Sequence, residues 1–238
     1  MRIRGQRECR NCGTRWAYYE TGSVECPSCG SLRSVGVEEE RRLHTATAAS
    51  LDLTEARDLL ESGGNLREVA DVAAEACREY LRGFGFVKAG DLQPLGETYL
   101  AATELRYVAG RLGRSMALGD DEEFYFLSLL RGTDHGERPS PEEVPDSLRS
   151  ARGLAYARAV SAYRSDLRSY LDEQPDPSAT DVLGPLDSHV KRVEALDGEV
   201  PAEESELLVR IAQGVGRYLR EDDESALAEA RNRLDRLP

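Results

Sequence analysis

Four of the five cysteines lie in two pairs near the N-terminus, and their spacing is that of a metal site. Cys9 and Cys12 form one C-x2-C pair, and Cys26 and Cys29 form a second pair after thirteen intervening residues. A two-residue gap lets both thiolates of a pair reach one ion, and the glycine that follows each pair can close a tight turn. Four thiolates complete the tetrahedral coordination that Zn²⁺ prefers, so we expect one structural zinc ion.

The same CxxC motif also occurs in redox-active or disulfide-bonded cysteine pairs and in iron sites. Redox-active or disulfide-bonded CxxC pairs are possible, but a reducing compartment favours a metal. Iron is a narrower rival, because a CPxCG knuckle also occurs in rubredoxins, and rubredoxin-like modules can be fused to bundles with di-iron E-x-x-H motifs. No histidine here has a glutamate three residues before it, and the thirteen-residue gap is short for a rubredoxin. We therefore expect zinc, with iron less favoured, in a closed site without a catalytic position.

Short strands must position these cysteines. Residues 15–19 alternate as a strand, residues 20–23 provide a turn, and residues 32–37 can supply a further strand. Residues 1–37 therefore predict a small β zinc ribbon. A module of this size buries too little apolar surface to fold alone, so we expect its folding to depend on the metal.

The first 37 residues resemble a zinc ribbon of the transcription-factor-TFIIB type, in having two CxxC knuckles on a small sheet. The start R-x-C-x-x-C-G-T-R-W-x-Y-Y-E-T-G-S-V-E-C-P, followed by an acidic helical remainder, is similar to a haloarchaeal zinc-ribbon family. The resemblance implies the metal fold, and it implies no activity.

The remainder of the chain predicts an all-α helical bundle domain. Residues 38–50, a charge run followed by small polar residues, indicate a linker, and residues 51–238 carry apolar side chains at helical spacing. A loop at residues 132–145 holds three prolines and could divide two subdomains. Caps at Asn65, Asp120 and Asp222 or Asp223, with Pro201 in a first turn, help to predict helices over residues 53–60, 65–82, 95–116, 122–130, 147–172, 179–196, 203–219 and 224–237.

Composition limits the classes of protein that remain. The chain has 238 residues and a net charge of −13, and only two of its 31 basic residues are lysines. An acidic, lysine-poor surface fits a halophilic protein that stays hydrated in concentrated salt. The longest apolar stretch, residues 124–130, is too short to cross a membrane, and the N-terminus lacks the apolar segment of a secretory signal. We therefore expect a cytoplasmic protein with no membrane contact.

The first 37 residues are the only part that is not acidic. Six arginines and three glutamates give them a charge of +3, while the rest of the chain sums to −16. A basic and aromatic surface suits phosphates and stacked bases, or a protein partner. In the opposing interpretation the arginines neutralise a four-thiolate zinc centre and the aromatics fill the small core. The candidate contact residues are Arg4, Arg10, Arg15, Trp16, Tyr18 and Arg33.

No enzyme motif accompanies the cysteines. Nucleophile-elbow, phosphate-binding, dinucleotide and zinc-protease patterns are all missing from the sequence, so the chain leans away from being an enzyme. Cys77 lies on an apolar helical stripe and predicts a buried, inert thiol. We favour a non-catalytic adaptor or regulatory protein whose ribbon docks a macromolecule and whose helices contact protein. The alternatives are a helical enzyme or small-molecule binder with a purely structural ribbon, and direct nucleic-acid binding through the ribbon.

Overall fold

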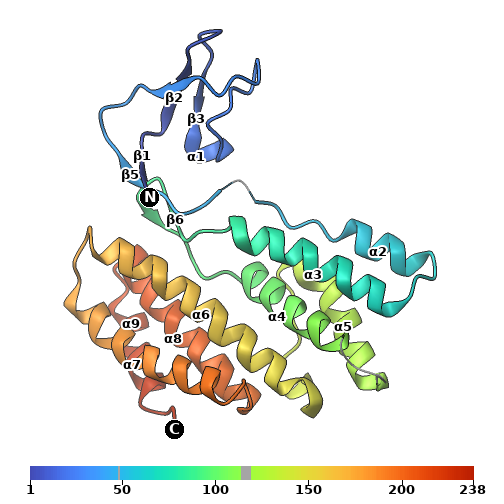
Figure 1. Cartoon of the computed structure of the whole chain (residues 1–238). Helices are drawn as coiled ribbons and strands as arrows, with labels where there is room; N and C mark the ends of the chain where they lie inside the picture. Colours follow the sequence, from blue (N-terminus) through green and yellow to red (C-terminus); the bar gives the residue numbers. More distant parts are fainter. Residues whose placement is uncertain (48, 114–118) are drawn as a thin grey trace.

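The computed structural model describes residues 1–47, 49–113 and 119–238. Residues 1–37 form a small β-rich module, here called the cysteine module, which stands clear of a helical body formed by residues 51–238 (Figure 1). The predicted order of a small β unit followed by a helical bundle is confirmed. None of the described helices combines the length and apolar character needed to cross a membrane.

The cysteine module is built on a three-stranded antiparallel sheet. Its strands are β2 (Gln6–Cys9), β3 (Arg15–Ala17) and β4 (Ser34–Gly36), in the order β3-β2-β4. The strand expected at residues 32–37 is therefore present. The strand expected over residues 15–19 ends early, because the chain turns into the single-turn helix α1 (Tyr18–Thr21). The amide of Gly22, at φ 62°, closes α1 by donating to the Tyr18 carbonyl at 2.7 Å.

Two small ladders join the cysteine module to the body. β1 (Arg2–Ile3) pairs with β5 (Arg42–Leu43), and β6 (Val87–Lys88) pairs with β7 (Asp91–Leu92). The amide of Gly90, in the turn between β6 and β7, donates to the Leu43 carbonyl at 2.8 Å. Part of the segment expected as a linker is thus built into the junction.

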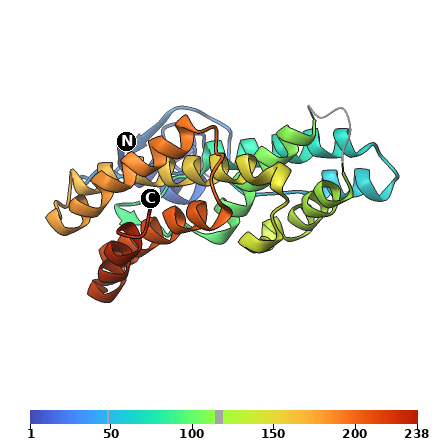
Figure 2. The same ribbon diagram turned by 90° about the horizontal axis from the view of Figure 1, so that it is seen from below.

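The body is a layered bundle that is longest along α6. Figure 2, seen from below, places α7 to α9 at one end and α2 to α5 at the other, as Figure 1 does. α6 packs against α4, α7 and α8 and links the two ends. The helices are α2 (Thr54–Glu61), α3 (Leu66–Gly83), α4 (Glu97–Leu112), α5 (Asp120–Gly132), α6 (Arg149–Leu171), α7 (Pro177–Ala195), α8 (Ala202–Glu221) and α9 (Glu224–Leu234), with 3-10 turns η1 (Thr133–His135), η2 (Pro141–Glu143) and η3 (Asp146–Leu148).

Helix starts follow the predicted caps in part. The Asn65 side chain accepts from the Arg67 amide at the start of α3, and Asp223 accepts from two amides of α9. The prediction for α5 is wrong: Gly119 is the N-cap, and Asp120 is the first helical residue. Pro201 likewise lies just before α8 rather than in its first turn. The end predicted for α4 at residue 116 lies outside the described residues.

The core of the body is continuous across the proline-rich loop. Four side chains at heptad spacing on α6, from Tyr156 to Leu167, have no exposed surface. Buried residues on both sides of residues 132–145 belong to the same apolar cluster, which extends from Leu43 to Leu237. In the described part of the chain, that loop therefore lies over one core instead of separating two.

Candidate metal centre

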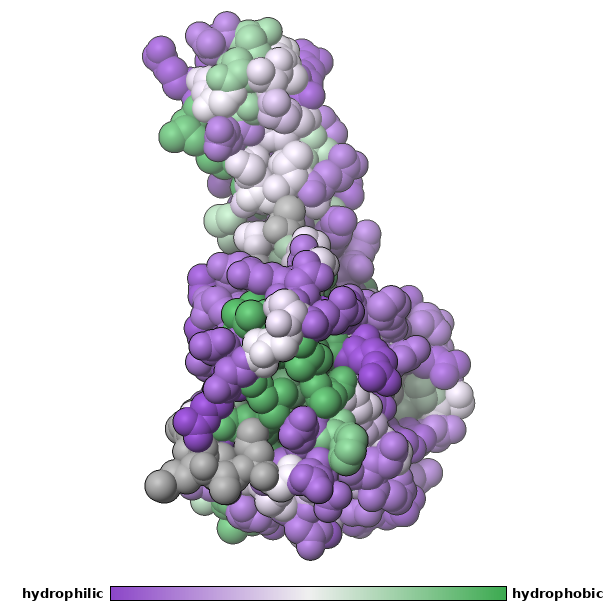
Figure 3. Space-filling view, turned by 90° about the vertical axis from the view of Figure 1, so that its right-hand side faces the viewer, coloured by the Kyte–Doolittle hydropathy of each residue, from purple (hydrophilic) through white to green (hydrophobic). Residues whose placement is uncertain are grey.

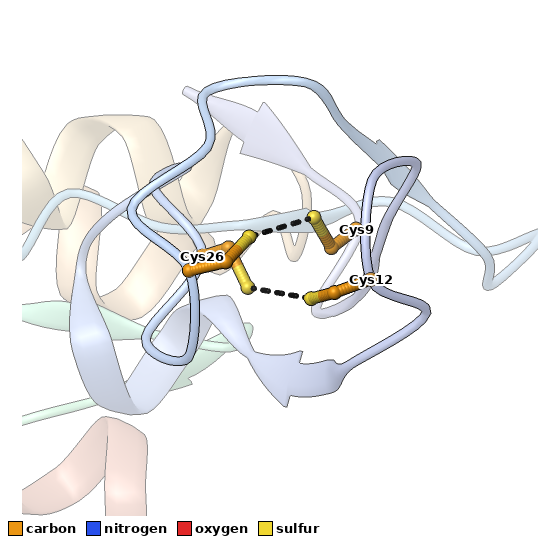
Figure 4. A group of neighbouring side chains, drawn as sticks. Cys9, Cys12 and Cys26 are labelled. Atoms are coloured by element: carbon orange, nitrogen blue, oxygen red, sulfur yellow. Dashed lines mark hydrogen bonds between the residues drawn. The ribbon is translucent and has the colours of Figure 1, made fainter.

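Two opposing loops bring the four predicted cysteine ligands together. Their sulfur atoms all lie within 4.8 Å of one another. Cys9 Sγ lies 3.7 Å from Cys29 Sγ, and Cys12 Sγ lies 3.6 Å from Cys26 Sγ. Figure 4 shows the side chains of the two pairs pointing at one another across the gap between the loops. Each pair therefore supplies half of one cluster.

Both loops use the same backbone turn. The Gly13 amide donates to the Cys9 carbonyl at 3.0 Å, and the Gly30 amide donates to the Cys26 carbonyl at 2.9 Å. Gly13 has φ 74° and Gly30 has φ 68°, a left-handed conformation that disfavours any side chain with a Cβ. The glycine after each CxxC pair is thus what lets the chain turn back beneath its two sulfurs.

The donor set fits a tetrahedral ion. A tetrahedron with Zn–S bonds of about 2.3 Å has S···S edges of about 3.8 Å, close to the two separations observed. The Asn11 amide donates to Cys9 Sγ at 3.4 Å, as expected for a thiolate acceptor. The Thr14 hydroxyl, 3.2 Å from Cys12 Sγ, is the main cause that lowers the pKa of that thiol to about 6. The four cysteines could therefore bind a metal ion such as zinc.

The fifth cysteine takes no part in this cluster. Cys77 lies on α3 with no exposed surface. Burial raises the pKa of its thiol to about 12. A thiol in this environment stays protonated near neutral pH and is a poor nucleophile, as the sequence predicts.

The predicted aromatic contact residues are in the interior of the module. Trp16 is only 7% exposed, packs with Cys9 and Cys26, and donates from Nε1 to the Ser23 carbonyl at 3.1 Å. Tyr18 is also 7% exposed and packs edge-on against His44 at the junction. Neither ring offers a free face to a base, so the two aromatics serve the fold of the module.

The four predicted arginines divide into two groups. Arg15 pairs with Glu8 at 2.7 Å, and Arg4 donates to the Gly36 carbonyl at 3.3 Å. Arg10 and Arg33 are exposed, and among the described residues their guanidinium groups have neither an acidic partner nor a hydrogen bond. Of the four, only these two lack a partner among the described residues; Arg15 is paired but 69% exposed.

Arg10 and Arg33 lie beside an apolar side chain that sequence reasoning missed. The Arg10 amide donates to the Arg33 carbonyl at 2.7 Å, which sets the two residues side by side. Leu32, next to Arg33, is 70% exposed. We call Arg10, Leu32 and Arg33 the knuckle face. One leucine after a CxxC pair gives no sequence signal that separates a core position from an exposed one.

The charge of the module depends on the metal. Four thiolates around a divalent ion carry a charge of −2. Added to the +3 of residues 1–37, this leaves about +1. A module with so little net positive charge attracts a phosphate backbone weakly, because binding to such a backbone depends on many contacts that neutralise phosphates.

A second polar cluster lies inside the body. Glu104 on α4 and Arg152 on α6 have no exposed surface and form an ion pair at 3.2 Å. The hydroxyl groups of Tyr125 and Tyr156 both donate to the Glu104 carboxylate. Tyr156 is fully buried on α6, and its hydroxyl group is used in this cluster.

Arg138 and Glu206 close this cluster toward the surface. Arg138 makes two hydrogen bonds to the Glu206 carboxylate, at 2.7 and 3.0 Å, and its guanidinium lies 5.2 Å from the centre of the Tyr156 ring. Two arginines balance two glutamates. The cluster therefore ties the loop before α6 to helices α4, α6 and α8, and most of its polar groups are hydrogen-bonded; the buried Nε of Arg152 has no hydrogen-bond partner among the described residues.

The structure and the site define a helical protein that carries a four-cysteine, metal-binding type of cluster on an N-terminal β module. Residues 1–234 match the model of a family described as a family of unknown function (DUF7117), and the chain belongs to that family. No curated protein and no solved structure matches the chain.

Proposed function

We propose that the protein is a zinc-binding, non-catalytic adaptor or regulatory protein. In this proposal the cysteine module is a zinc ribbon that docks a macromolecule through its knuckle face, and the helical body contacts protein. The likeness of the ribbon to those of transcription factors suggests transcription or RNA machinery as the setting. Zinc is the ion proposed because four thiolates in a tetrahedron are its preferred structural site.

The observation that carries the proposal is the pairing of a closed metal cluster with an unsatisfied surface beside it. Four cysteine ligands leave no coordination position for a substrate, so the metal supports structure. Beside it, Leu32 is exposed next to Arg33, whose backbone bonds to Arg10, and neither guanidinium group has a partner among the described residues. An exposed apolar side chain flanked by arginines is typical of a protein interface, where arginine is enriched and lysine is depleted.

Protein is favoured over nucleic acid as the docked molecule. The aromatic rings that would stack on bases are buried, and the metal-loaded module carries about +1. Two free arginines and one leucine are sufficient for a small protein contact and insufficient for a phosphate track.

Affinity capture with matched variants tests the proposal. Tagged wild type, Leu32→Asp and Val37→Asp are used as baits, each with nuclease-treated and untreated lysate from the source cells. Val37 is the control, because it is 43% exposed and follows the opposite end of β4 from Leu32. Proteins retained by wild type and Val37→Asp after nuclease, and lost with Leu32→Asp, support docking. Loss of all partners after nuclease would instead assign the face to nucleic acid.

A further inference from the structure

The body carries a cleft at the end away from the cysteine module. It has a volume of about 930 Å³ and lies between the start of α5 and the segment that contains η2 and η3. Figure 1 places α5 at the far end of the body from the cysteine module, so a chain cannot reach this cleft with its own knuckle face. Six carboxylate residues line it: Asp120, Asp121, Glu122, Glu142, Glu143 and Asp146.

The cleft also has an apolar lining. Phe124 is 70% exposed, the same fraction as Leu32, and the buried Val144, on the loop after η2, also lines the cleft. An aromatic side chain this exposed is not explained by packing within the body, because its neighbours Tyr125 and Phe126 are the ones that face the core. The end of the body that carries α2 and α5 also shows a patch of hydrophobic side chains within a hydrophilic border in the space-filling view (Figure 3), so exposed apolar surface is a feature of this end as a whole.

Among the described residues, the acidic side chains of the cleft outnumber the basic side chains that pair with them. Asp146 pairs with Arg149 at 2.5 Å, while the Glu122 and Glu143 carboxylates accept backbone amides at helix starts. None of the described lining residues is an arginine or a lysine. The helix starts explain part of this acidity, because negative charge is favourable there. They do not explain why an exposed phenylalanine lies among the carboxylates.

We propose that the knuckle face of one copy docks in this cleft of a second copy. The proposal rests on the proposed function, whose docking face it uses, and it names the partner. Leu32 would pack on Phe124, while Arg10 and Arg33 would pair with the carboxylates at the rim. The two surfaces match in both respects. Each has an exposed apolar side chain beside charges of opposite sign, and in the cleft Asp120 and Asp121 form no ion pair among the described residues.

The contact is heterologous, because different surfaces of the two copies meet. Such contacts build either a closed ring or an open head-to-tail chain. Each contact is small, so it belongs to the weak, transient class of interfaces and its occupancy depends on concentration. Repulsion between two chains of net charge −13 acts over a longer range, and salt screens it beyond about 8 Å at physiological ionic strength. Added salt therefore weakens both the repulsion between bodies and the exposed arginine–carboxylate pairs, while the packing of Leu32 is not screened.

Sedimentation velocity across a concentration series tests the proposal with the whole metal-loaded chain. Wild type is expected to show average mass rising with concentration above 26.3 kDa. Leu32→Asp, which lacks the apolar knuckle residue, and Phe124→Asp, which lacks the cleft residue, are each expected to stay monomeric. Val37→Asp and Leu196→Asp, at exposed positions outside both surfaces, are expected to associate like wild type. Metal content and far-ultraviolet circular dichroism check that each variant is folded.

A mixture of the two defective variants gives the sharper result. Leu32→Asp retains an intact cleft and Phe124→Asp retains an intact knuckle face, so the mixture can form one contact and stop at a one-to-one dimer. That dimer, absent from either variant alone, supports the proposal. A wild type that is monomeric at every concentration overturns it, as does wild-type association that persists in both variants. In that case the proposed docking function still stands if capture depends on Leu32, which separates the two failures.

Discussion

The backbone amide of Arg10 donates to the carbonyl of Arg33 at 2.7 Å, and this bond joins the first cysteine loop to the chain that leaves the second. Leu32 is held at the surface next to that bond. The positions of the residues of the knuckle face therefore depend on both the four-cysteine cluster and the sheet. Its side chains are placed only while both loops are held in register.

Removal of the metal should unfold the cysteine module and leave the body folded. Structural zinc contributes on the order of 10 kcal/mol of apparent folding free energy, and Trp16 packs directly on two of the cysteines. We expect a chelator to abolish the near-ultraviolet signal of Trp16, with most of the helical far-ultraviolet signal retained. A Trp16 signal that is unchanged after the metal is shown to be gone would contradict this.

Two helix glycines should respond in opposite directions to the same substitution. A Cβ on Gly153 of α6 would lie 2.2 Å from the Gly198 carbonyl oxygen, whereas a Cβ on Gly184 of α7 would have no atom within 4 Å. We expect Gly153→Ala to destabilise the body by about 1–3 kcal/mol through overpacking. Gly184→Ala should instead stabilise it, by up to about 1 kcal/mol. Urea denaturation measures both, and equal effects would mean that α6 and the turn at Gly198 are not in close contact.

Loss of one buried charge should cost far more than loss of an exposed one on the same helix. Arg152→Ala leaves the Glu104 carboxylate buried without its cation, which we expect to cost about 3–5 kcal/mol. Arg158 is the control, since its side chain is 62% exposed and its pairing with Glu194 is at 3.5 Å. Arg158→Ala should cost less than about 1 kcal/mol. If urea midpoints show similar losses for both variants, the buried cluster does not support the body as described.

Acidification should weaken the junction between module and body. His44 is 3% exposed, and its Nδ1 accepts a hydrogen bond from the Ala89 amide at 3.2 Å. Burial lowers the pKa of His44 below 6.5, and the nearby charges of Lys88 and the N-terminal amine act in the same direction. As pH falls through 6.5 the unfolded chain binds a proton that the folded chain does not, so stability is lost.

His44→Phe provides the comparison for this pH effect, since it keeps a ring at the junction and removes the titration. Thermal unfolding is followed by Trp16 fluorescence at neutral pH and at a pH below 6.5. We expect the wild type to lose more stability than the variant on acidification. Parallel losses would show that His44 does not sense the pH.

Local patterns in the sequence predict much of this structure. The CxxC spacing identifies the four cysteines that the fold brings together, because each pair shapes its own turn with the glycine that follows. Helix positions follow from apolar periodicity and from caps such as Asn65 and Asp223. These signals depend on residues close in the chain, which is why they need no tertiary information.

Features that depend on residues distant in the chain cannot be predicted from local sequence patterns. Glu104 and Arg152 are separated by 48 positions, and each looks like a solvated charge until the helices pack. Trp16 and Tyr18 suit a contact surface equally well until the sheet encloses them. Leu32 is the opposite case. A leucine is usually expected in a core, and only the folded module shows that this one is exposed.

Native mass spectrometry of the purified chain tests the central claim, that Cys9, Cys12, Cys26 and Cys29 hold one zinc ion. Wild type and Cys77→Ser, the control thiol outside the cluster, are expected to carry one zinc ion per chain. The double variant Cys12→Ser/Cys26→Ser, which removes one ligand from each pair, is expected to carry none. Iron in the wild type, or zinc retained by the double variant, would contradict the account.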